Sequence, residues 1–263
     1  MTRPRPERPL SARLMVFTVA AAALAGACAA PPPRAPNTGP TPIPLQPGCV
    51  AASQSNALCI LILGDSLAVG VPIDIYQRWW LQLRHRLEVA LPGRVIAVDN
   101  WAVAGSQVEV LESAAHDQPA VTTYDLAIVI EGVNDEHRMS AAEWLPRYEA
   151  AIATLQAKGL TVIVTAPPPN YENGAFGTRY DPFAAAVRDV AARGRPLLDI
   201  AGRWHADGPA LAGTYYADVI HQNAAGQDVM AAMAFDVVLE SIGADTAARP
   251  PASGVEGRAE RHR

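Results

Sequence analysis

The stretch Leu58-Cys59-Ile60-Leu61-Ile62-Leu63-Gly64-Asp65-Ser66 decides the fold class of this chain. Its six apolar residues, rich in Ile and Leu and ended by a glycine, predict a buried strand. Ser66 is therefore expected at the exit of a central strand, where parallel α/β sheets place their functional groups. A serine at that position is chemically interesting only if a base can reach it.

Beyond this strand, apolar runs alternate with segments of helical pattern. The alternation predicts a parallel sheet with helices on both faces, and no long repeat suggests a solenoid. Gly159 is placed to end the third long helix, and Asn223 is placed to cap the last one. Strands are expected at 58–63, 95–99, 126–130, 161–165 and 197–200, and helices at 75–90, 108–115, 141–158, 182–193 and 224–241.

Further candidate residues occupy places from which they can meet Ser66. Gly105 follows the second predicted strand, and Asn134 follows the third. Successive strand exits of a parallel sheet share one edge, so both residues are expected near Ser66. Asp218 stands three residues before His221, just ahead of the last helix, so the carboxylate can reach the imidazole within one turn of chain.

Four sequence blocks, taken in order, carry a family resemblance. They are Gly64-Asp65-Ser66-Leu67, Asn100-Trp101-Ala102-Val103-Ala104-Gly105, Gly132-Val133-Asn134-Asp135 and Asp218-Val219-Ile220-His221. Each block alone is a weak signal, but the four together resemble the GDSL or SGNH hydrolase family of esterases and lipases. The resemblance spans residues 58–242, which is the whole predicted folded domain.

The resemblance implies a flavodoxin-like α/β/α sandwich and a serine esterase that works through a covalent acyl-enzyme. Ser66 would be the nucleophile, and His221 would be the base, because a serine hydroxyl needs a base within hydrogen-bond reach. Asp218 would fix the imidazole tautomer and stabilise the imidazolium. The backbone N–H groups of Ser66 and Gly105 and the side-chain amide of Asn134 would form the oxyanion hole.

Each candidate also has a plainer structural interpretation. Ser66 could cap the turn after its strand, and Gly105 could serve a turn that needs a positive φ. Asn134 could form an Asx turn with Asp135. Asp65 and Asp135 themselves are expected to be structural, with Asp65 bonding loop amides beside the serine.

Other classes of site lack their sequence motifs. Ala68, not Gly, stands two residues after Ser66, which disfavours the nucleophile elbow of α/β-hydrolases. The chain has no His-Glu-x-x-His, no Cys-x-x-Cys and no phosphate-binding glycine loop, so we expect no metal and no cofactor. The net charge is −5 although residues 1–27 carry four Arg and one Glu, so the remainder is acidic. Nucleic acid is therefore not an expected partner.

The beginning of the chain has the pattern of an export signal. An Arg-bearing start precedes an apolar stretch at 14–24 that is too short to span a bilayer, and small residues follow up to Cys28. We expect residues 1–27 to be a signal peptide and Cys28 to be lipidated, which would anchor the protein to a membrane of the cell envelope. Ordinary cleavage near 27–30, giving a periplasmic or secreted protein, and a retained anchor are the alternatives.

Composition divides the rest of the chain. Residues 28–56 are rich in proline and predict an extended tether, 57–243 form the hydrolase domain, and 244–263 predict a disordered tail. Cys49 and Cys59 could form a disulfide that leaves Cys28 unpaired, as lipidation would. A buried strand position is the other interpretation of Cys59. The protein is expected to be a monomer.

The substrate is only loosely constrained by the sequence. Family members act on lipid, thioester and sugar acetyl esters, so a small-molecule, glycan or lipid ester is expected. The segment 166–176 follows the fourth predicted strand and has no long apolar run. This favours small acyl groups, such as acetyl on envelope carbohydrate. An acyltransferase acting on envelope glycans and a non-catalytic binding lipoprotein are the alternative functions.

Overall fold

The computed structural model describes residues 46–248, with side chains as far as residue 243. The predicted signal peptide, Cys28 and the first part of the predicted tether lie outside the described residues. The last part of the predicted tail, from residue 249, lies outside them too. Within the described part, no helix is both long enough and apolar enough to cross a membrane.

Both ends of the folded part extend beyond the boundaries expected from the sequence. Residues 46–56 were expected in the tether, but they form the 3-10 helix η1 (Val50–Ser53), and the Cys49 N–H donates to Thr123 Oγ1 at 2.8 Å. At the other end, helix α7 (Ala224–Ala248) continues past the expected start of the tail at 244. Three of the five residues 244–248 are alanine, which favours helix.

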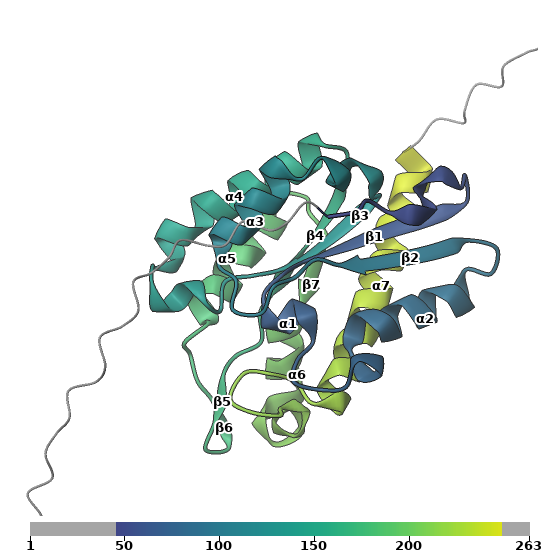
Figure 1. Cartoon of the computed structure of the whole chain (residues 1–263). Coiled ribbons are helices and arrows are strands. Elements are labelled where there is room, and N and C mark those ends of the chain that lie inside the picture. The colour runs from purple at the N-terminus through teal and green to yellow at the C-terminus, as the bar shows by residue number, and fades with distance from the viewer. Residues whose placement is uncertain (1–45, 249–263) are drawn as a thin grey trace, which may run out of the picture. The chain divides into compact units, whose positions relative to one another are not determined.

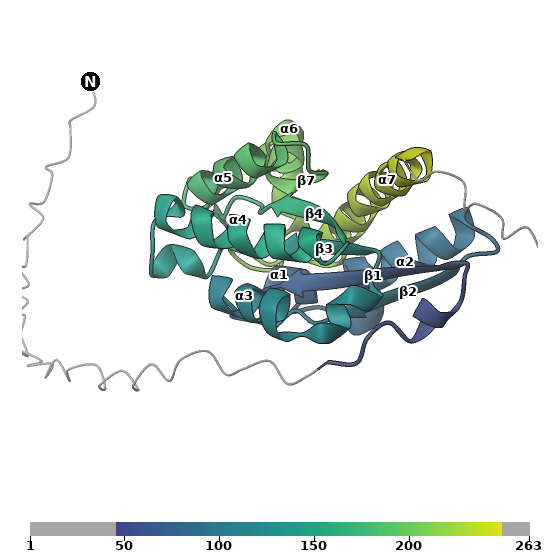
Figure 2. The ribbon, with the colours of Figure 1, turned by 90° about the horizontal axis from the view of Figure 1, so that it is seen from above.

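A five-stranded sheet organises the described residues, as Figures 1 and 2 show. Its order is β2-β1-β3-β4-β7 and every neighbouring pair is parallel, which confirms the predicted five-stranded parallel sheet. The chain starts at an inner strand and winds outward in both directions, as in flavodoxin-like folds. The strands are β1 (Ala57–Gly64), β2 (Val95–Asn100), β3 (Leu126–Ile130), β4 (Thr161–Ala166) and β7 (Leu197–Asp199).

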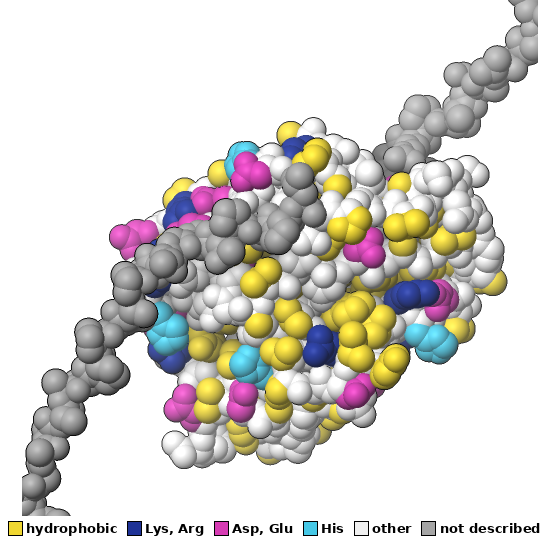
Figure 3. Space-filling model, viewed as in Figure 1, with side chains coloured by type: hydrophobic (Ala, Val, Ile, Leu, Met, Phe, Trp, Pro, Cys, Tyr) yellow, Lys and Arg dark blue, Asp and Glu magenta, His cyan; other side chains and the backbone are white. Residues whose placement is uncertain are grey.

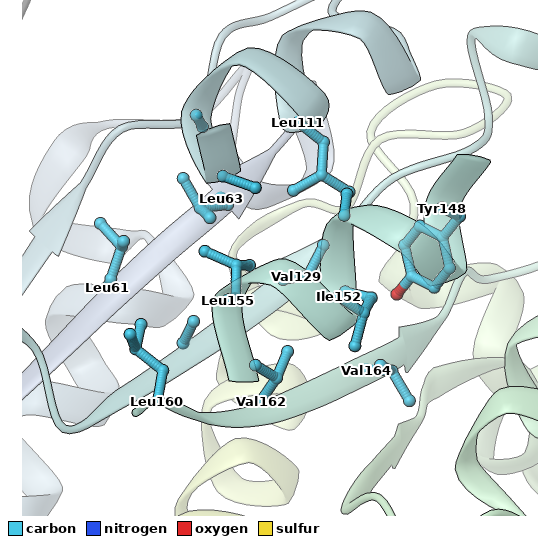
Figure 4. Close-up of a cluster of buried hydrophobic side chains, with 14 of the residues drawn as sticks. Leu61, Leu63, Leu111, Val129, Tyr148, Ile152, Leu155, Leu160, Val162 and Val164 are labelled. Atoms are coloured by element: carbon cyan, nitrogen blue, oxygen red, sulfur yellow. The ribbon is translucent and has the colours of Figure 1, made fainter. Parts of the chain in front are cut away.

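The central strand β1 explains the layers, because its side chains alternate between the two faces of the sheet. Cys59, Leu61 and Leu63 point to one helical layer, and the residues between them point to the other. All six apolar side chains of 58–63 are buried, and burial of each leucine and isoleucine contributes about 1.5–3 kcal/mol. Figure 4 shows Leu61 and Leu63 in the cluster that the first layer closes, with Leu111 and Leu155.

The helices lie in two layers, one on each face of the sheet. The layer that closes the cluster of Figure 4 consists of α3 (Val108–Asp117), α4 (Ala141–Ala157) and α5 (Asp181–Ala191). The opposite face is covered by α2 (Trp79–Ala90), α6 (Ile200–Ala212) and α7. The three-layer α/β/α sandwich expected from the family resemblance is therefore confirmed.

Several helix ends follow local rules that the sequence displays. Ser140 caps α4 in a capping box with Glu143, whose carboxylate accepts the Ser140 N–H at 2.9 Å. Gly159, predicted to end this helix, lies just beyond it with φ +99°. Asn223, predicted to cap the last helix, accepts the Ala225 N–H on its Oδ1 at 3.0 Å.

Three elements differ from the sequence expectation. The helix expected at 75–90 is divided into a 3-10 turn, η2 (Ile75–Gln77), and α2, because Arg78 between them is extended with ψ 142°. Helix α6 was not predicted, and its first residue was assigned to the last strand. A small hairpin, formed by β5 (Tyr171–Glu172) and β6 (Ala175–Phe176), was not predicted either.

Cys49 and Cys59 form a disulfide. Cys59 is also buried in β1, at 1% exposure. The two interpretations of Cys59 that the sequence left open therefore hold together. The cross-link ties the segment before the first strand to the middle of the sheet, which is why the tether boundary lies earlier than expected.

Candidate active site

Ser66 begins the short helix α1 (Ser66–Val69) directly after β1. The turn between them needs Gly64, which has φ +130° and approaches β3 so closely that a Cβ would lie 1.8 Å from the Ile130 carbonyl oxygen. Asp65 Oδ1 accepts the Leu67 N–H at 2.8 Å, the loop-amide bond expected of this residue. The tight turn brings Ser66 to the carboxyl edge of the sheet.

Ser66, His221 and Asp218 form a hydrogen-bonded chain. His221 Nε2 lies 2.9 Å from Ser66 Oγ, and His221 Nδ1 lies 2.8 Å from Asp218 Oδ2. The Asp218 side chain is about half exposed, and that of His221 is one-quarter exposed. The imidazole therefore joins the serine hydroxyl to the carboxylate, although 155 residues separate Ser66 from His221.

The carboxylate of Asp218 is held ionised by its own loop. Its Oδ1 accepts the backbone N–H groups of Ile220 at 2.9 Å and His221 at 2.8 Å. Burial raises the pKa of Asp218, but these hydrogen bonds and the one to the imidazole outweigh it and lower the pKa below its usual value. Asp218 thus both shapes the loop and carries a negative charge beside the imidazole.

The hairpin that follows β4 supports the loop of His221 from outside. The Tyr171 N–H donates to the Val219 carbonyl at 2.8 Å, and the Tyr171 ring stacks on Tyr216 with centroids 5.3 Å apart. Within the loop, the Ala217 N–H donates to the His221 carbonyl at 2.8 Å. The sequence placed this segment after the fourth predicted strand but did not indicate its structural role. The Asn-Gly pair at 173–174 is the signal that would have revealed the hairpin.

Gly105 and Asn134 lie in the loops after the strands that flank β1. Gly105 has φ +81°, so the turn interpretation of this residue holds whatever its chemical role. Among the described residues, neither the Gly105 N–H nor the Ser66 N–H has a backbone or side-chain acceptor. Asn134 Nδ2 donates to the Ser106 carbonyl at 2.9 Å, which uses one of its two amide protons.

The loops of Gly105 and Asn134 are joined to the exit of β1. The N–H groups of Trp101 and Val103 donate to the carbonyls of Ile62 and Gly64, each at 2.9 Å, so the loop after β2 continues the pairing of the sheet. Asn134 does not form the Asx turn with Asp135, because its side-chain oxygen accepts no backbone N–H of the turn that follows, while its amide donates across to the other loop. These contacts bring the three strand exits together, as the topology predicts.

Three buried carboxyl groups lie beneath this edge. Burial, opposed by hydrogen bonds from nearby backbone amides, raises the pKa of Asp65 to about 7. Burial likewise raises the pKa of Asp135 to about 6, and Asp135 Oδ1 accepts the first N–H of α3, from Val108, at 3.1 Å. Burial and the charges of those two neighbours raise the pKa of Glu131 well above its usual value. Glu131 was not predicted as part of the site, because no local pattern marks a glutamate as buried.

Within residues 46–248, no three His, Cys, Asp or Glu side chains are placed to hold a metal ion. Val103 and Val219, each two residues from Gly105 or His221, are about half exposed. On the face shown in Figure 3, basic side chains are scattered among acidic, histidine and hydrophobic ones.

Known proteins resemble this chain in sequence and in fold. Residues 62–229 match the GDSL-like Lipase/Acylhydrolase family. Esterase TesA of Pseudomonas aeruginosa is 29% identical over 187 residues, which cover 63% of this chain and 88% of TesA.

Solved structures share the fold at lower identity. The lipase/acylhydrolase from Enterococcus faecalis has a TM-score of 0.60 and 18% identity, over 70% of this chain and 97% of its own. The acetyl xylan esterase AlAXEase has a TM-score of 0.58 and 17% identity, over 68% of this chain and 99% of its own. Because the family match spans more than half of the sequence, the chain belongs to the GDSL-like lipase/acylhydrolase family and is a carboxylic ester hydrolase.

Proposed function

We propose that this protein is an exported serine esterase that hydrolyses short-chain or O-acetyl esters through a covalent acyl-enzyme. The observation that carries the mechanism is the 2.9 Å contact between His221 Nε2 and Ser66 Oγ. Ser66 Oγ attacks the ester carbonyl carbon while His221 takes the hydroxyl proton. The proton then passes to the departing alkoxide oxygen as its bond to carbon breaks, which leaves an acyl group on Ser66.

Water completes the cycle by the reverse sequence. His221 takes a proton from a water molecule while the water oxygen bonds to the acyl carbon, which gives a tetrahedral intermediate. When this intermediate collapses, the bond between the acyl carbon and Ser66 Oγ breaks, and Ser66 Oγ recovers the proton from the imidazolium. Asp218 is ionised throughout, so its charge stabilises each imidazolium that forms. A carboxylic acid and an alcohol are released.

The negative charge that develops on the substrate oxygen needs prearranged donors. The N–H groups of Ser66 and Gly105 serve this purpose, because neither has an acceptor among the described residues. The second amide proton of Asn134 is the third donor, and the first is fixed on the Ser106 carbonyl. Each such donor contributes about 3 kcal/mol to transition-state stabilisation in comparable sites.

A short acyl group on a polar alcohol fits the surroundings of the site. The exposed large apolar side chains nearest Gly105 and His221 in sequence are Val103 and Val219, each two residues before one of them, and the partly buried Ile220 directly precedes His221. A hollow of about 480 Å³ has both polar and apolar side chains in its lining, and the first of its lining residues, Glu136, comes two residues after Asn134 in the sequence. Its lining includes Glu136, Arg138, Met139, Ser140, Arg179 and Phe183. Guanidinium and carboxylate groups bind sugar hydroxyls better than alkyl chains. Two structural relatives are named for activity on acetylated glycans, an acetyl xylan esterase and an esterase active on acetylated mannans.

Export is supported by the disulfide between Cys49 and Cys59, because such bonds persist in oxidising compartments. We propose that residues 1–27 are removed and that Cys28 carries the lipid that holds the enzyme to a membrane of the cell envelope. Residues 28–45 would then connect the lipid to the folded part, which acts as a monomer. Mass spectrometry of the mature N-terminus tests this: an unmodified terminus at any residue would refute the lipid anchor.

Hydrolysis of p-nitrophenyl acetate, butyrate and octanoate by wild type and by Ser66→Ala tests the mechanism. We expect loss of activity in Ser66→Ala, highest kcat/KM for acetate, and labelling of Ser66 by a fluorophosphonate. Because hydrogen bonds lower the pKa of Asp218 below its usual value, we expect no loss of kcat/KM from protonation of Asp218 at mildly acid pH. Equal activity in Ser66→Ala would refute the acyl-enzyme.

Two alternatives give different products. A glycan O-acyltransferase would transfer the acyl group to an added oligosaccharide in preference to water. A binding lipoprotein would bind esters but would not turn them over and would not react with the fluorophosphonate. Product analysis with and without the oligosaccharide separates both from the esterase.

A further inference from the structure

Among the described residues, Glu131 is the carboxyl group that contacts Ser106, which follows Gly105 in the loop of the proposed oxyanion hole. It follows β3 at once, three residues before Asn134, and is 1% exposed. Its Oε2 lies 2.9 Å from Ser106 Oγ, and its Oε1 accepts the Gly132 N–H at a long 3.4 Å. Among the described residues, no Lys, Arg or His forms an ion pair with Glu131.

The hydroxyl of Ser106 has two oxygen neighbours and only one proton. Ser106 Oγ lies 2.9 Å from Glu131 Oε2 and 3.0 Å from the Gly64 carbonyl oxygen. The Gly64 carbonyl, which already accepts the Val103 N–H, can only accept, so its 3.0 Å contact with Ser106 Oγ is attractive only if the hydroxyl proton points to it. The second contact then requires a proton on Glu131. If Glu131 were ionised, one of the two buried oxygen pairs would have no proton between its members, which is costly.

The surroundings of Glu131 favour the neutral acid. Asp65, from the turn after β1, and Asp135, from the loop after β3, each add negative charge that disfavours a further carboxylate. Tyr148 of α4 faces the same space with a buried hydroxyl. Burial without a cation disfavours the ionised form most strongly. The hydrogen count and the environment therefore agree.

The bonds of Ser106 reach three parts of the site. Its hydroxyl donates to the Gly64 carbonyl, two residues before the nucleophile, and its carbonyl accepts the Asn134 side-chain amide at 2.9 Å. The backbone N of Ser106 is bonded directly to the carbonyl carbon of Gly105, so the two residues move together. A rotation of Ser106 would move the Gly105 N–H and release the Asn134 amide together.

We propose that Glu131, as a neutral acid, is a positioning residue that fixes Ser106 and, through it, the Gly105 and Asn134 donors of the oxyanion hole. This inference rests on the proposed function, because it assigns no contact between Glu131 and the substrate. The donors act on the transition state far more than on the bound ester, so their misplacement lowers kcat and leaves KM almost unchanged.

Three variants of the full chain test the proposal. Glu131→Gln keeps the shape and a donor for Ser106, so kcat should stay within about 3-fold of wild type. Glu131→Leu removes the donor, and we expect kcat on p-nitrophenyl acetate to fall by about 10–100-fold, with KM within about 2-fold. Ser106→Ala removes the shared hydroxyl and should give a similar loss. Adding Glu131→Leu to it should cost little more, because both changes break one unit.

A spectroscopic readout is independent of activity. In the infrared difference between wild type and Glu131→Gln at neutral pH, we expect the carbonyl stretch of a protonated carboxylic acid. A carboxylate band in its place would overturn the proposal, even if Glu131→Leu and Ser106→Ala failed to fold. Equal kcat in Glu131→Leu and wild type, with the fold shown intact by circular dichroism, would also overturn it while leaving the Ser66 mechanism standing. Inactive wild-type protein would refute the proposed function. The infrared difference spectrum would still decide whether Glu131 is protonated.

Discussion

Reduction of the disulfide between Cys49 and Cys59 should destabilise the fold without changing the chemistry of the site. The cross-link spans 10 residues and ties the segment 46–56 to β1. Cys59 lies in the first half of that strand, whereas Ser66 follows its other end. We therefore expect the bond to affect the free energy of unfolding and to leave kcat almost unchanged while the protein remains folded.

The size of the effect follows from the length of the closed loop. Cross-linking a 10-residue loop lowers the entropy of the unfolded chain by an amount worth about 2.7 kcal/mol at 25 °C. Reduction leaves every side chain in place, so loss of packing adds little to this value. For a total stability of about 5–15 kcal/mol, such a loss is large.

Urea unfolding followed by tryptophan fluorescence, with and without dithiothreitol, measures this difference. The matched control is the double variant Cys49→Ala/Cys59→Ala, whose unfolding midpoint should not respond to dithiothreitol. Ester hydrolysis at a urea concentration well below the midpoint should be equal in the oxidised and reduced wild type. An unfolding curve that does not shift when thiol titration proves the bond reduced would refute the entropic reasoning.

Three other predictions address the site. Asn134→Ala should lower kcat by about 100-fold with little change in KM, as measured with p-nitrophenyl acetate. If the fraction of folded protein fell by the same factor as kcat, the role of Asn134 would be structural only. Tyr171→Ala should lower kcat/KM by about 2–10-fold through loss of the stack on Tyr216, whereas Tyr171→Phe should not. Burial raises the pKa of Asp65 to about 7, above its value in the unfolded chain, so its contribution to stability is complete at low pH and is lost as pH rises towards 7. Urea midpoints from pH 5 to 8 should therefore fall more steeply in wild type than in Asp65→Asn.

Much of the fold could be predicted because it depends on local patterns. The run 58–63 is apolar at every position since both faces of the sheet are covered, and this marks a central parallel strand. Helix α6 was missed because Gly202 and the pair Gly208-Pro209 read as breaks. Gly202 is needed because a Cβ there would lie 2.5 Å from the Asp199 carboxylate, which caps the helix. Gly202, which made a helix seem improbable from the sequence, is thus part of the first turn of α6.

The proposed catalytic residues were found because their chemistry requires particular residue types at strand exits. Asp218 and His221 are close in sequence, and the topology brings them to Ser66. The support beneath them was not predictable in the same way. Glu131 follows an apolar run, where a glutamate ordinarily marks the return to solvent. Its burial depends on Ser106, which comes from the loop of another strand.

Lysine is present at a single position of the sequence, Lys158. It caps the end of α4, and its Nζ donates to the Ala115 carbonyl at 2.5 Å. Strand β4 begins three residues later, so this amine lies at the amino edge of the sheet, opposite the edge where Ser66 emerges. Apart from the chain's own α-amino group, an amine-reactive resin has this one point of attachment. An enzyme immobilised through Lys158 would be held in a uniform orientation, with its proposed active site facing the solution.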